Sequence, residues 1–390
     1  MGPLQGLRVL ELSSFLNGPY TGRILGELGA DVIKVEPPWG DPMRHVPPYV
    51  GKDSLHFIFY NANKKFVTLN IKEPRGKHIL FELLKKVDVL VENFKPGTLD
   101  NAGLGYEEQK RVNPKIISVS ATGYGYEGPY RDYPGFDPTV QAVSGLMDTN
   151  GFPDMPTRVG MGVLDLATPA FTVIAILAAL RYRDLTGEGQ RIDMSMFDVA
   201  VILSQQSMVY YLGGLPVRIG PSSHIFAPES LFKTKDGFAY AIIHTQEAFQ
   251  NLAEYFGESQ VAEDPRFRTN DDRLRNREEL LQIASGWFAR LSTKEAVELV
   301  MSVGGVAGEL RDLKEQLHDP HVEARHLYLD FTMPNNEKVR IPGSAFKMEK
   351  TPGVVTHPGL PVGYHNEEIY SGLLMISKNE LAQLRTEGVV

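Results

Sequence analysis

The first 120 residues alternate between short apolar runs and segments with helical spacing, which constrains the fold more than any other feature. Apolar runs bounded by turn-forming or charged residues predict buried strands at 7–12, 31–36, 66–71, 87–91 and 115–120. Helical spacing separates most of these runs. Because β–α–β units pair their strands in parallel, the pattern predicts a doubly wound α/β domain. Ligands of such a domain bind beyond the carboxyl ends of the strands.

A single carboxylate, Asp165, precedes a very apolar helical segment. Thr168 suits the N-cap of this helix and Pro169 its first position, where a missing N–H is not needed. Residues 170–180 contain one polar side chain, so we expect a helix that is buried on most sides. The apolar run is shorter than the ~20 residues that span a bilayer. From the local sequence, Asp165 is either a loop carboxylate that hydrogen-bonds the helix start or a functional group.

Beyond this helix, glycine, proline and serine become frequent and the pattern changes to a hairpin followed by helices. We predict a large α/β domain at 1–212, a linker at 213–227, a smaller α+β domain at 228–320, and a C-terminal segment at 321–390 that returns to the large domain.

Composition excludes several kinds of protein. The 390 residues carry a net charge of −8 without a long basic run, which argues against nucleic-acid binding. The absence of cysteine excludes disulfides, thiolate metal sites and cysteine nucleophiles. Ten histidines are scattered without a metal-binding spacing, so we expect no metal. The N-terminus lacks the pattern of a signal peptide, which predicts a cytoplasmic protein that does not associate with membranes.

Three local features have a structural explanation as well as a functional one. Gly123–Gly128 matches GxGxxG, but the proline-rich residues that follow cannot form the helix a dinucleotide site needs. Lys72 follows a predicted strand and is either a phosphate ligand or a surface lysine. Phe94 either packs against an adenine ring or plugs the core. The sequence contains no GxSxG motif, which argues against a serine hydrolase.

Taken together, motifs along essentially the whole chain resemble the class III (family III) CoA-transferases. This group holds formyl-CoA and carnitine CoA-transferases and, as relatives, the α-methylacyl-CoA racemases. The motifs that carry the resemblance are LQGLRVLELSSFLNGP (4–19), GADVIKVEPPWGDPMR (29–44), NANKKFVTLNIK (61–72), ENFKPGTLDNAGLGY (92–106), SATGYGYEGPYRDYPGFDPTVQAVSGLM (120–147), the stretch around Asp165 with TGEGQRIDMSMFD (186–198), FKTKDGFAYAI (232–242), DPRFRTNDDRLRN (264–276), DPHVEAR (319–325) and HPGLPVGYHNEEI (357–369).

The resemblance implies a Rossmann-like large domain with a parallel sheet, a smaller α+β domain and an interlocked homodimer. It implies that Asp165 is the catalytic nucleophile and that the Gly123–Gly128 loop is structural. An acyl-CoA thioester and a carboxylic acid would be the substrates, with no permanently bound cofactor. The CoA-binding positions carried over are Leu69, Lys72, Asn93, Phe94 and Phe136.

The chain departs from the formyl-CoA transferase pattern at four positions. Leu16 replaces a glutamine, Pro37 and Asn101 replace arginines, and Pro169 replaces a glycine. The two lost arginines remove partners for the phosphates or the adenine of CoA.

The implied reaction proceeds through mixed anhydrides and an aspartyl-CoA thioester on Asp165. Two alternatives remain. A racemase would need a histidine opposite the aspartate, but Phe136 stands where the racemase branch has it. The other alternative is a non-catalytic CoA-binding paralogue. Family frequency makes aliphatic dicarboxylates such as succinate the first guess for the acids.

Overall fold

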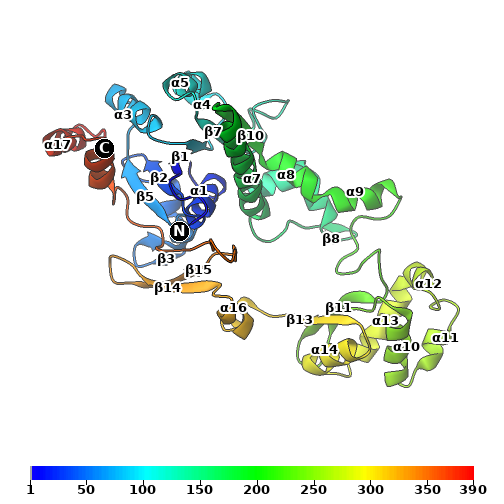
Figure 1. Ribbon diagram of the computed structural model, residues 1–390. Helices are drawn as coiled ribbons and strands as arrows, with labels where there is room; N and C mark the ends of the chain where they lie inside the picture. The colour runs from blue at the N-terminus through cyan, green and yellow to red at the C-terminus, as the bar shows by residue number, and fades with distance from the viewer. Residues whose placement is uncertain (1) are drawn as a thin grey trace. The chain divides into compact units, whose positions relative to one another are not determined.

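The computed structural model describes residues 2–390, which form two compact units (Figure 1). The larger unit contains the chain up to Thr149, Arg158–Val209 and Pro320–Val390. The smaller unit contains Asn150–Thr157 and Tyr210–Asp319. Each unit is described separately below.

A parallel sheet of six strands forms the centre of the larger unit. Its order is β10-β7-β6-β1-β2-β5, and every neighbouring pair runs parallel. Counted along the chain, this is the 3-2-1-4-5-6 order of doubly wound sheets, in which the order reverses between β1 and β6. The predicted parallel α/β architecture is therefore confirmed. The strands are β1 (Arg8–Leu12), β2 (Asp31–Glu36), β5 (Lys64–Thr68), β6 (Val89–Glu92), β7 (Ile117–Thr122) and β10 (Gln190–Ser195).

Helices cover both faces of this sheet (Figure 1). Successive residues of a strand point to opposite faces, so Val9 packs with α1 (Asn17–Glu27) and α7 (Val163–Thr186). Leu10 packs on the other face, with α3 (Pro74–Leu84) and the C-terminal helix α17 (Lys378–Thr386). Burial on both faces explains why the strands appear in the sequence as continuous apolar runs.

Further elements of the larger unit connect or extend this core. They are η1 (Pro42–His45), β3 (Tyr49–Val50), β4 (Asp53–Ser54), α2 (Leu55–Tyr60), α4 (Thr98–Asn101), α5 (Tyr106–Val112), α6 (Asp137–Val143), η2 (Leu146–Thr149), α16 (Pro320–Ala324), β14 (Tyr328–Thr332), β15 (Lys338–Pro342) and the π-helix η3 (Glu367–Leu373). After β10 the chain forms two helices, α8 (Met196–Leu203) and α9 (Gln205–Leu212), where the sequence pattern predicts one helix over 198–212 that begins at Asp198. Ser195, not Asp198, caps α8 by accepting the Asp198 N–H.

The start of α7 differs from the prediction. The helix begins at Val163 after Gly162, so Pro169 lies inside it and Thr168 is not its N-cap. The earlier start is possible because Asp137, from a distant part of the sequence, accepts the N–H groups of Leu164 and Asp165. Its predicted end is confirmed, since Gly187 has the left-handed conformation (φ 80°) that terminates helices.

The burial of α7 also differs from the prediction. Val173 and Ile176 are buried against the sheet, whereas Ile174 and Leu185 are exposed by 63% and 67%. In this chain the helix is therefore buried on one face and not on most sides. With 24 residues and a mean hydropathy of 2.1, α7 is long and apolar enough to cross a membrane, contrary to the length argument made from residues 170–180. A helix packed against the core of a soluble protein passes the same test.

The smaller unit contains an antiparallel sheet of three strands covered by helices. The hairpin predicted near 231–243 is present as β11 and β12, and Trp287 and Phe288 lie in its core. The elements are β8 (Gly151–Phe152), β9 (Met155–Pro156), β11 (Glu229–Lys233), β12 (Phe238–Ile242), α10 (Gln246–Tyr255), α11 (Ser259–Glu263), α12 (Asn270–Arg275), α13 (Arg277–Phe288), α14 (Thr293–Ser302), β13 (Val306–Glu309) and α15 (Leu313–Gln316).

Candidate active site

A cavity of about 300 Å³ lies beyond the carboxyl ends of β1, β2, β5 and β6, where the strand order of the sheet reverses. Doubly wound sheets bind their ligands at this position. Three of the residues predicted to hold CoA line it, namely Leu69, Lys72 and Phe94. The complete lining is Leu12, Ser13, Ser14, Val35, Glu36, Pro37, Trp39, Asp41, Pro42, Leu69, Asn70, Ile71, Lys72 and Phe94.

Lys72 and Phe94 present different chemistry to this cavity. Lys72 is exposed, and its amine forms no ion pair with any residue that the structure describes. Phe94 is half-buried, and it packs against the apolar core of the sheet while it also lines the cavity. Phe94 thus packs in the core and also faces the cavity, and its contact with an adenine ring stays a prediction. A free cation beside apolar side chains suits a ligand that combines a phosphate with a flat ring.

Asn93, a predicted CoA-binding position, connects two of the loops beside the cavity. Its side chain accepts the Ser14 N–H at 3.0 Å and donates to the Ser14 carbonyl at 2.8 Å. It thereby ties the end of β6 to the loop that leaves β1, and this loop lines the cavity. Asn93 is absent from the lining itself, so the geometry gives it a positioning role.

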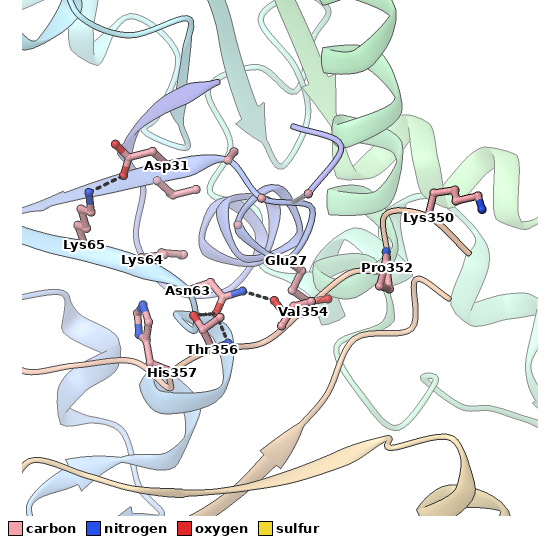
Figure 2. Close-up of a pocket in the computed structure, with 15 residues that line it drawn as sticks. Glu27, Asp31, Asn63, Lys64, Lys65, Lys350, Pro352, Val354, Thr356 and His357 are labelled. Carbon is pink, nitrogen blue, oxygen red and sulfur yellow. Dashed lines mark hydrogen bonds and ion pairs between the residues drawn. The ribbon is translucent and has the colours of Figure 1, made fainter. Parts of the chain in front are cut away.

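A second cavity of about 340 Å³ lies at the opposite edge of the sheet, by the amino ends of β2 and β5 (Figure 2). Its polar side chains are already engaged. Lys65 pairs with Asp31 and Glu368, and Asn63 hydrogen-bonds Val354 and Thr356. Its lining includes neither Asp165 nor any of the five positions that the resemblance assigns to CoA binding.

Asp165 lies in the first turn of α7 and is half-buried. The carboxylate that caps this helix is Asp137, whose Oδ2 accepts from the N–H groups of Leu164 at 2.6 Å and of Asp165 at 3.2 Å. Gln141 donates to the other oxygen of Asp137 at 2.6 Å. Asp137 is therefore the carboxylate that caps the start of α7. The Asp165 side chain does not cap this helix.

Burial, and with smaller effect the nearby negative charge of Asp137, raises the pKa of Asp165 to about 7. Within residues 2–390, no side chain or backbone N–H donates a hydrogen bond to the Asp165 carboxylate. Its ionised form is therefore poorly solvated and poorly compensated. A carboxylate in this state is a stronger nucleophile and base than one in water.

Two residues near Asp165 were not identified from the sequence. Asp137 could have been suspected, because an acidic residue followed by proline is typical of a helix start. Tyr60, in α2, has a pKa raised by burial and also, with smaller effect, by the charges of Tyr20 and Asp165. Only the tertiary structure brings α2 within electrostatic range of Asp165.

Phe136 connects the surroundings of Asp165 with the cavity. It precedes Asp137 in the chain and is 61% exposed. Its ring meets Phe15 edge-to-face, with 6.1 Å between ring centres, and Phe15 belongs to the same β1–α1 loop as Ser14. Phe15 has a left-handed backbone (φ 63°), which is unusual for a residue with a side chain of this size. The β1–α1 loop thus lines the cavity with Ser14 and contacts Phe136 with Phe15, although Phe136 does not line the cavity.

Backbone N–H groups of the Gly123–Gly128 loop donate hydrogen bonds to neighbouring side chains of the protein. The N–H of Gly125 donates to Thr122 and that of Tyr126 to Asp193, and the Arg191 guanidinium lies 3.7 Å from the centre of the Tyr126 ring. The loop is thereby tied to β10, and no helix begins at its end. This arrangement supports the structural role that was expected.

Of the four positions that depart from the family pattern, three can be compared by whether they line the cavity. Pro37 lines it, so the position of the lost arginine faces the site. Leu16 packs in an apolar cluster with Met43, Phe57 and Phe66 and is not a polar contact. Asn101 is exposed at the end of α4 and does not line the cavity.

Comparisons with known proteins agree with this geometry. The sequence model of "CoA-transferase family III" matches residues 4–366. Succinyl-CoA–D-citramalate CoA-transferase of Chloroflexus aurantiacus is 34% identical over 100% of this chain and 98% of its own length. Mouse succinyl-CoA:glutarate CoA-transferase is 36% identical over 100% and 91%. Acetyl-CoA:oxalate CoA-transferase of Acetobacter aceti is 36% identical over 92% of each chain.

Solved structures give the same result. The crystal structure of a CAIB/BAIF family protein from Brucella suis aligns with a TM-score of 0.86 and 33% identity, covering 95% of this chain and 99% of that one. The chain therefore belongs to CoA-transferase family III. The resemblance inferred from the sequence motifs is confirmed, as is the class of enzyme. The roles of Asp165 and of the five CoA-binding positions stay predictions.

Proposed function

We propose that this protein moves CoA from an acyl-CoA thioester to a carboxylic acid, with Asp165 as the covalent nucleophile. The observation that carries the proposal is the Asp165 carboxylate itself. It is half-buried, receives no hydrogen bond and has a pKa raised to about 7, in a chain of CoA-transferase family III. A poorly solvated carboxylate suits attack on a thioester carbonyl.

The reaction runs through acyl transfers at the Asp165 carboxyl group. One of its oxygens attacks the carbonyl carbon of the donor thioester, the C–S bond breaks, and CoA leaves as a thiolate, which gives a mixed anhydride. The thiolate attacks the Asp165 carboxyl carbon and releases the donor acid, which leaves an aspartyl-CoA thioester. The acceptor carboxylate then attacks this thioester and forms a second anhydride. The thiolate takes the acceptor's acyl group and Asp165 is regenerated, with no net gain or loss of protons.

The proposed substrates follow the named activities of the relatives. Two of them are named for succinyl-CoA as donor, and their acceptors, D-citramalate and glutarate, are dicarboxylic acids. A third is named for acetyl-CoA and oxalate. We expect a short acyl-CoA donor and an aliphatic dicarboxylate acceptor, and a panel of such acids would identify the pair.

The proposed CoA site comprises the cavity and the loop beside it. Leu69, Lys72 and Phe94 line the cavity, which supports their predicted contacts with CoA. Asn93 would act by holding Ser14, and Phe136 through its contact with Phe15.

We also propose a homodimer, in which a second copy covers the apolar side chains that this chain leaves exposed. Sedimentation at low protein concentration tests this proposal, since a monomer would contradict it. Exposed apolar residues of α7, α8 and α9 that support it are Ile174, Leu185, Val201, Ile202, Val209 and Leu212.

A racemase is the less favoured alternative. Proton exchange at the α-carbon requires a second acid–base group opposite Asp165, and the phenyl ring of Phe136 cannot transfer a proton. Incubation of a 2-methylacyl-CoA in D₂O without any acceptor acid separates the two reactions. Rapid deuterium incorporation would contradict the transferase assignment.

Trapping the covalent intermediate tests the proposed function directly. Incubation with succinyl-CoA alone should leave a CoA thioester on Asp165, detected by mass spectrometry of the intact protein and its peptides. Hydroxylamine should remove the adduct, because it cleaves thioesters. A protein that turns over substrate while CoA is never found on Asp165 would contradict the mechanism.

We predict that kcat/KM for the acyl-CoA falls as the pH decreases through about 7, since the nucleophile must be ionised and its pKa is raised to about 7. Well below this pH, the loss should approach tenfold per pH unit. Asp137→Asn removes the neighbouring negative charge and should move this decline to lower pH. A profile that is the same in both proteins would show that Asp165 does not govern it.

A further inference from the structure

Trp39 is the one large aromatic side chain that lines the candidate CoA cavity and is mostly exposed among residues 2–390. Its exposed fraction is 65%. Its indole ring forms no aromatic or cation–π contact with any part of the chain that the structure describes. Indole rings are usually well buried, because they contribute a large apolar area, so an exposed one at the wall of a cavity indicates a ligand.

The loop that carries Trp39 is rigid. Pro37 and Pro38 precede it, and the Gly40 N–H closes a β-turn on the Pro37 carbonyl at 2.8 Å. Gly40 has a left-handed backbone (φ +90°), and an added Cβ there would lie 2.9 Å from the Arg44 side chain.

A buried carboxylate anchors the turn from below. Glu36 accepts the Asp41 N–H at 2.8 Å and pairs with Arg44 through both of its oxygens, at 2.6 and 2.7 Å. The Arg44 guanidinium in turn lies 3.5 Å from the centre of the Phe57 ring. Trp39 is therefore presented to the cavity by a preorganised turn, which reduces the entropy lost when a ligand binds.

The other walls of the cavity match one part of CoA. Phe94, Leu69 and Ile71 provide apolar surface, and Lys72 provides a cation that forms no ion pair with any of the residues 2–390. A flat heteroaromatic ring beside anionic groups fits these walls, and the adenosine phosphate end of CoA has this chemistry.

We propose that Trp39 stacks on the adenine ring of the CoA thioester and is a main determinant of its affinity. This inference rests on the proposed function, since it takes acyl-CoA as the ligand. Stacking of a base on an aromatic side chain is among the larger single contributions to nucleotide binding, and indole offers the widest surface for it.

Tryptophan fluorescence of the full-length protein tests the proposal, because the chain contains two tryptophans and Trp287 is fully buried in the smaller unit. CoA and adenosine 3′,5′-bisphosphate should quench the emission with saturation, and pantetheine should not. Trp39→Ala should raise the KM for acyl-CoA about tenfold or more with little change in kcat. Trp39→Phe should give an intermediate KM, and the control Tyr255→Ala, an exposed aromatic of the smaller unit, should leave it unchanged.

The failures of the two proposals are distinguishable. If the wild type transfers CoA but its emission does not respond to CoA and Trp39→Ala keeps the wild-type KM, the assignment of Trp39 is wrong and the transferase remains. Emission that changes with protein concentration and not with CoA would also overturn it, because a second copy would then cover the indole. If the protein neither binds nor turns over any acyl-CoA, the proposed function fails and the inference fails with it.

Discussion

Replacing Asp165 by alanine or asparagine should abolish CoA transfer, lowering kcat by roughly 10⁴-fold or more, as expected when a covalent nucleophile is removed. The physical reason is that each step of the proposed reaction forms or breaks a bond to the Asp165 carboxyl group. The measurement is transfer from succinyl-CoA to dicarboxylic acids, with circular dichroism as a check of the fold. Transfer within a factor of ten of the wild type would exclude Asp165 as the nucleophile.

Asp165→Asn should also change the free energy of unfolding in a way that depends on pH, because the pKa of the Asp165 carboxyl is raised in the folded protein. The pKa of Asp165 is raised from 3.8 to about 7 in the folded protein. The folded state therefore binds this proton more tightly than the unfolded state does. The associated stabilisation is complete below pH 3.8 and is lost as the pH rises through 7.

At pH 8 the asparagine variant should be more stable than the wild type by on the order of 2 kcal/mol, and the difference should vanish near pH 4. Chemical denaturation at both pH values measures this. Equal stability at pH 8 would show that the ionised carboxylate is well compensated, which would remove the electrostatic basis of the proposed reactivity.

Lys34→Met should destabilise the larger unit by about 3–5 kcal/mol, the range found when one partner of a buried ion pair is removed. Lys34 is fully buried, and its amine lies 3.0 Å from Glu11 and 2.9 Å from Asp41. It also donates to the Ser13 carbonyl at 2.7 Å. Burial alone would lower the pKa of Lys34, but the surrounding carboxylates raise it, so the amine stays charged. Removal leaves Asp41 buried without its cation.

Loss of Lys34 should also disturb the walls of the candidate CoA cavity, because its partners Ser13 and Asp41 line this cavity. Asp41 accepts the N–H groups of Phe15 and Met43, at 3.3 and 2.9 Å, and so positions the loop after β1. Protein that still folds should therefore show a higher KM for acyl-CoA.

Lys85→Met is the matched control for Lys34→Met. It breaks an exposed pair with Glu82 and should change stability by less than about 1 kcal/mol. Denaturation midpoints compare the two variants. A Lys34→Met protein as stable as the control would contradict the importance of the buried charges.

The position of a strand could be predicted from the sequence where the strand carries apolar side chains on both of its faces. The strand predicted at 31–36 coincides with β2, because Val32, Ile33 and Val35 put apolar side chains on both faces and turn residues bound it. The strand predicted at 66–71 is β5, Lys64–Thr68, which lies two to three residues earlier. Lys64 did not resemble a strand residue, yet it is fully buried, because its amine pairs with Glu11, 53 positions earlier in the chain, at 2.8 Å.

The candidate site was predictable to the extent that it depends on strand ends. Lys72 and Phe94 follow strands of one parallel sheet, and such ends meet at one edge whatever the loops do. That Asn93 binds CoA stays a prediction, and the sequence does not reveal that its amide hydrogen-bonds Ser14. Trp39 carried no signal, since nothing local distinguishes an exposed indole from a buried one.

By itself, the sequence determined the parallel α/β architecture, the enzyme family and the choice of Asp165 as the residue to test. Periodic apolar runs and ordered motifs encode these features locally, so they can be read without coordinates. Only the tertiary structure decided where α7 begins and how Asp165 is solvated. The helix start depends on the carboxylate of Asp137, 28 positions away, and the pKa of Asp165 is raised by burial and, with smaller effect, by the charge of Asp137. Contacts between residues far apart in the chain set such properties, and no local pattern records them.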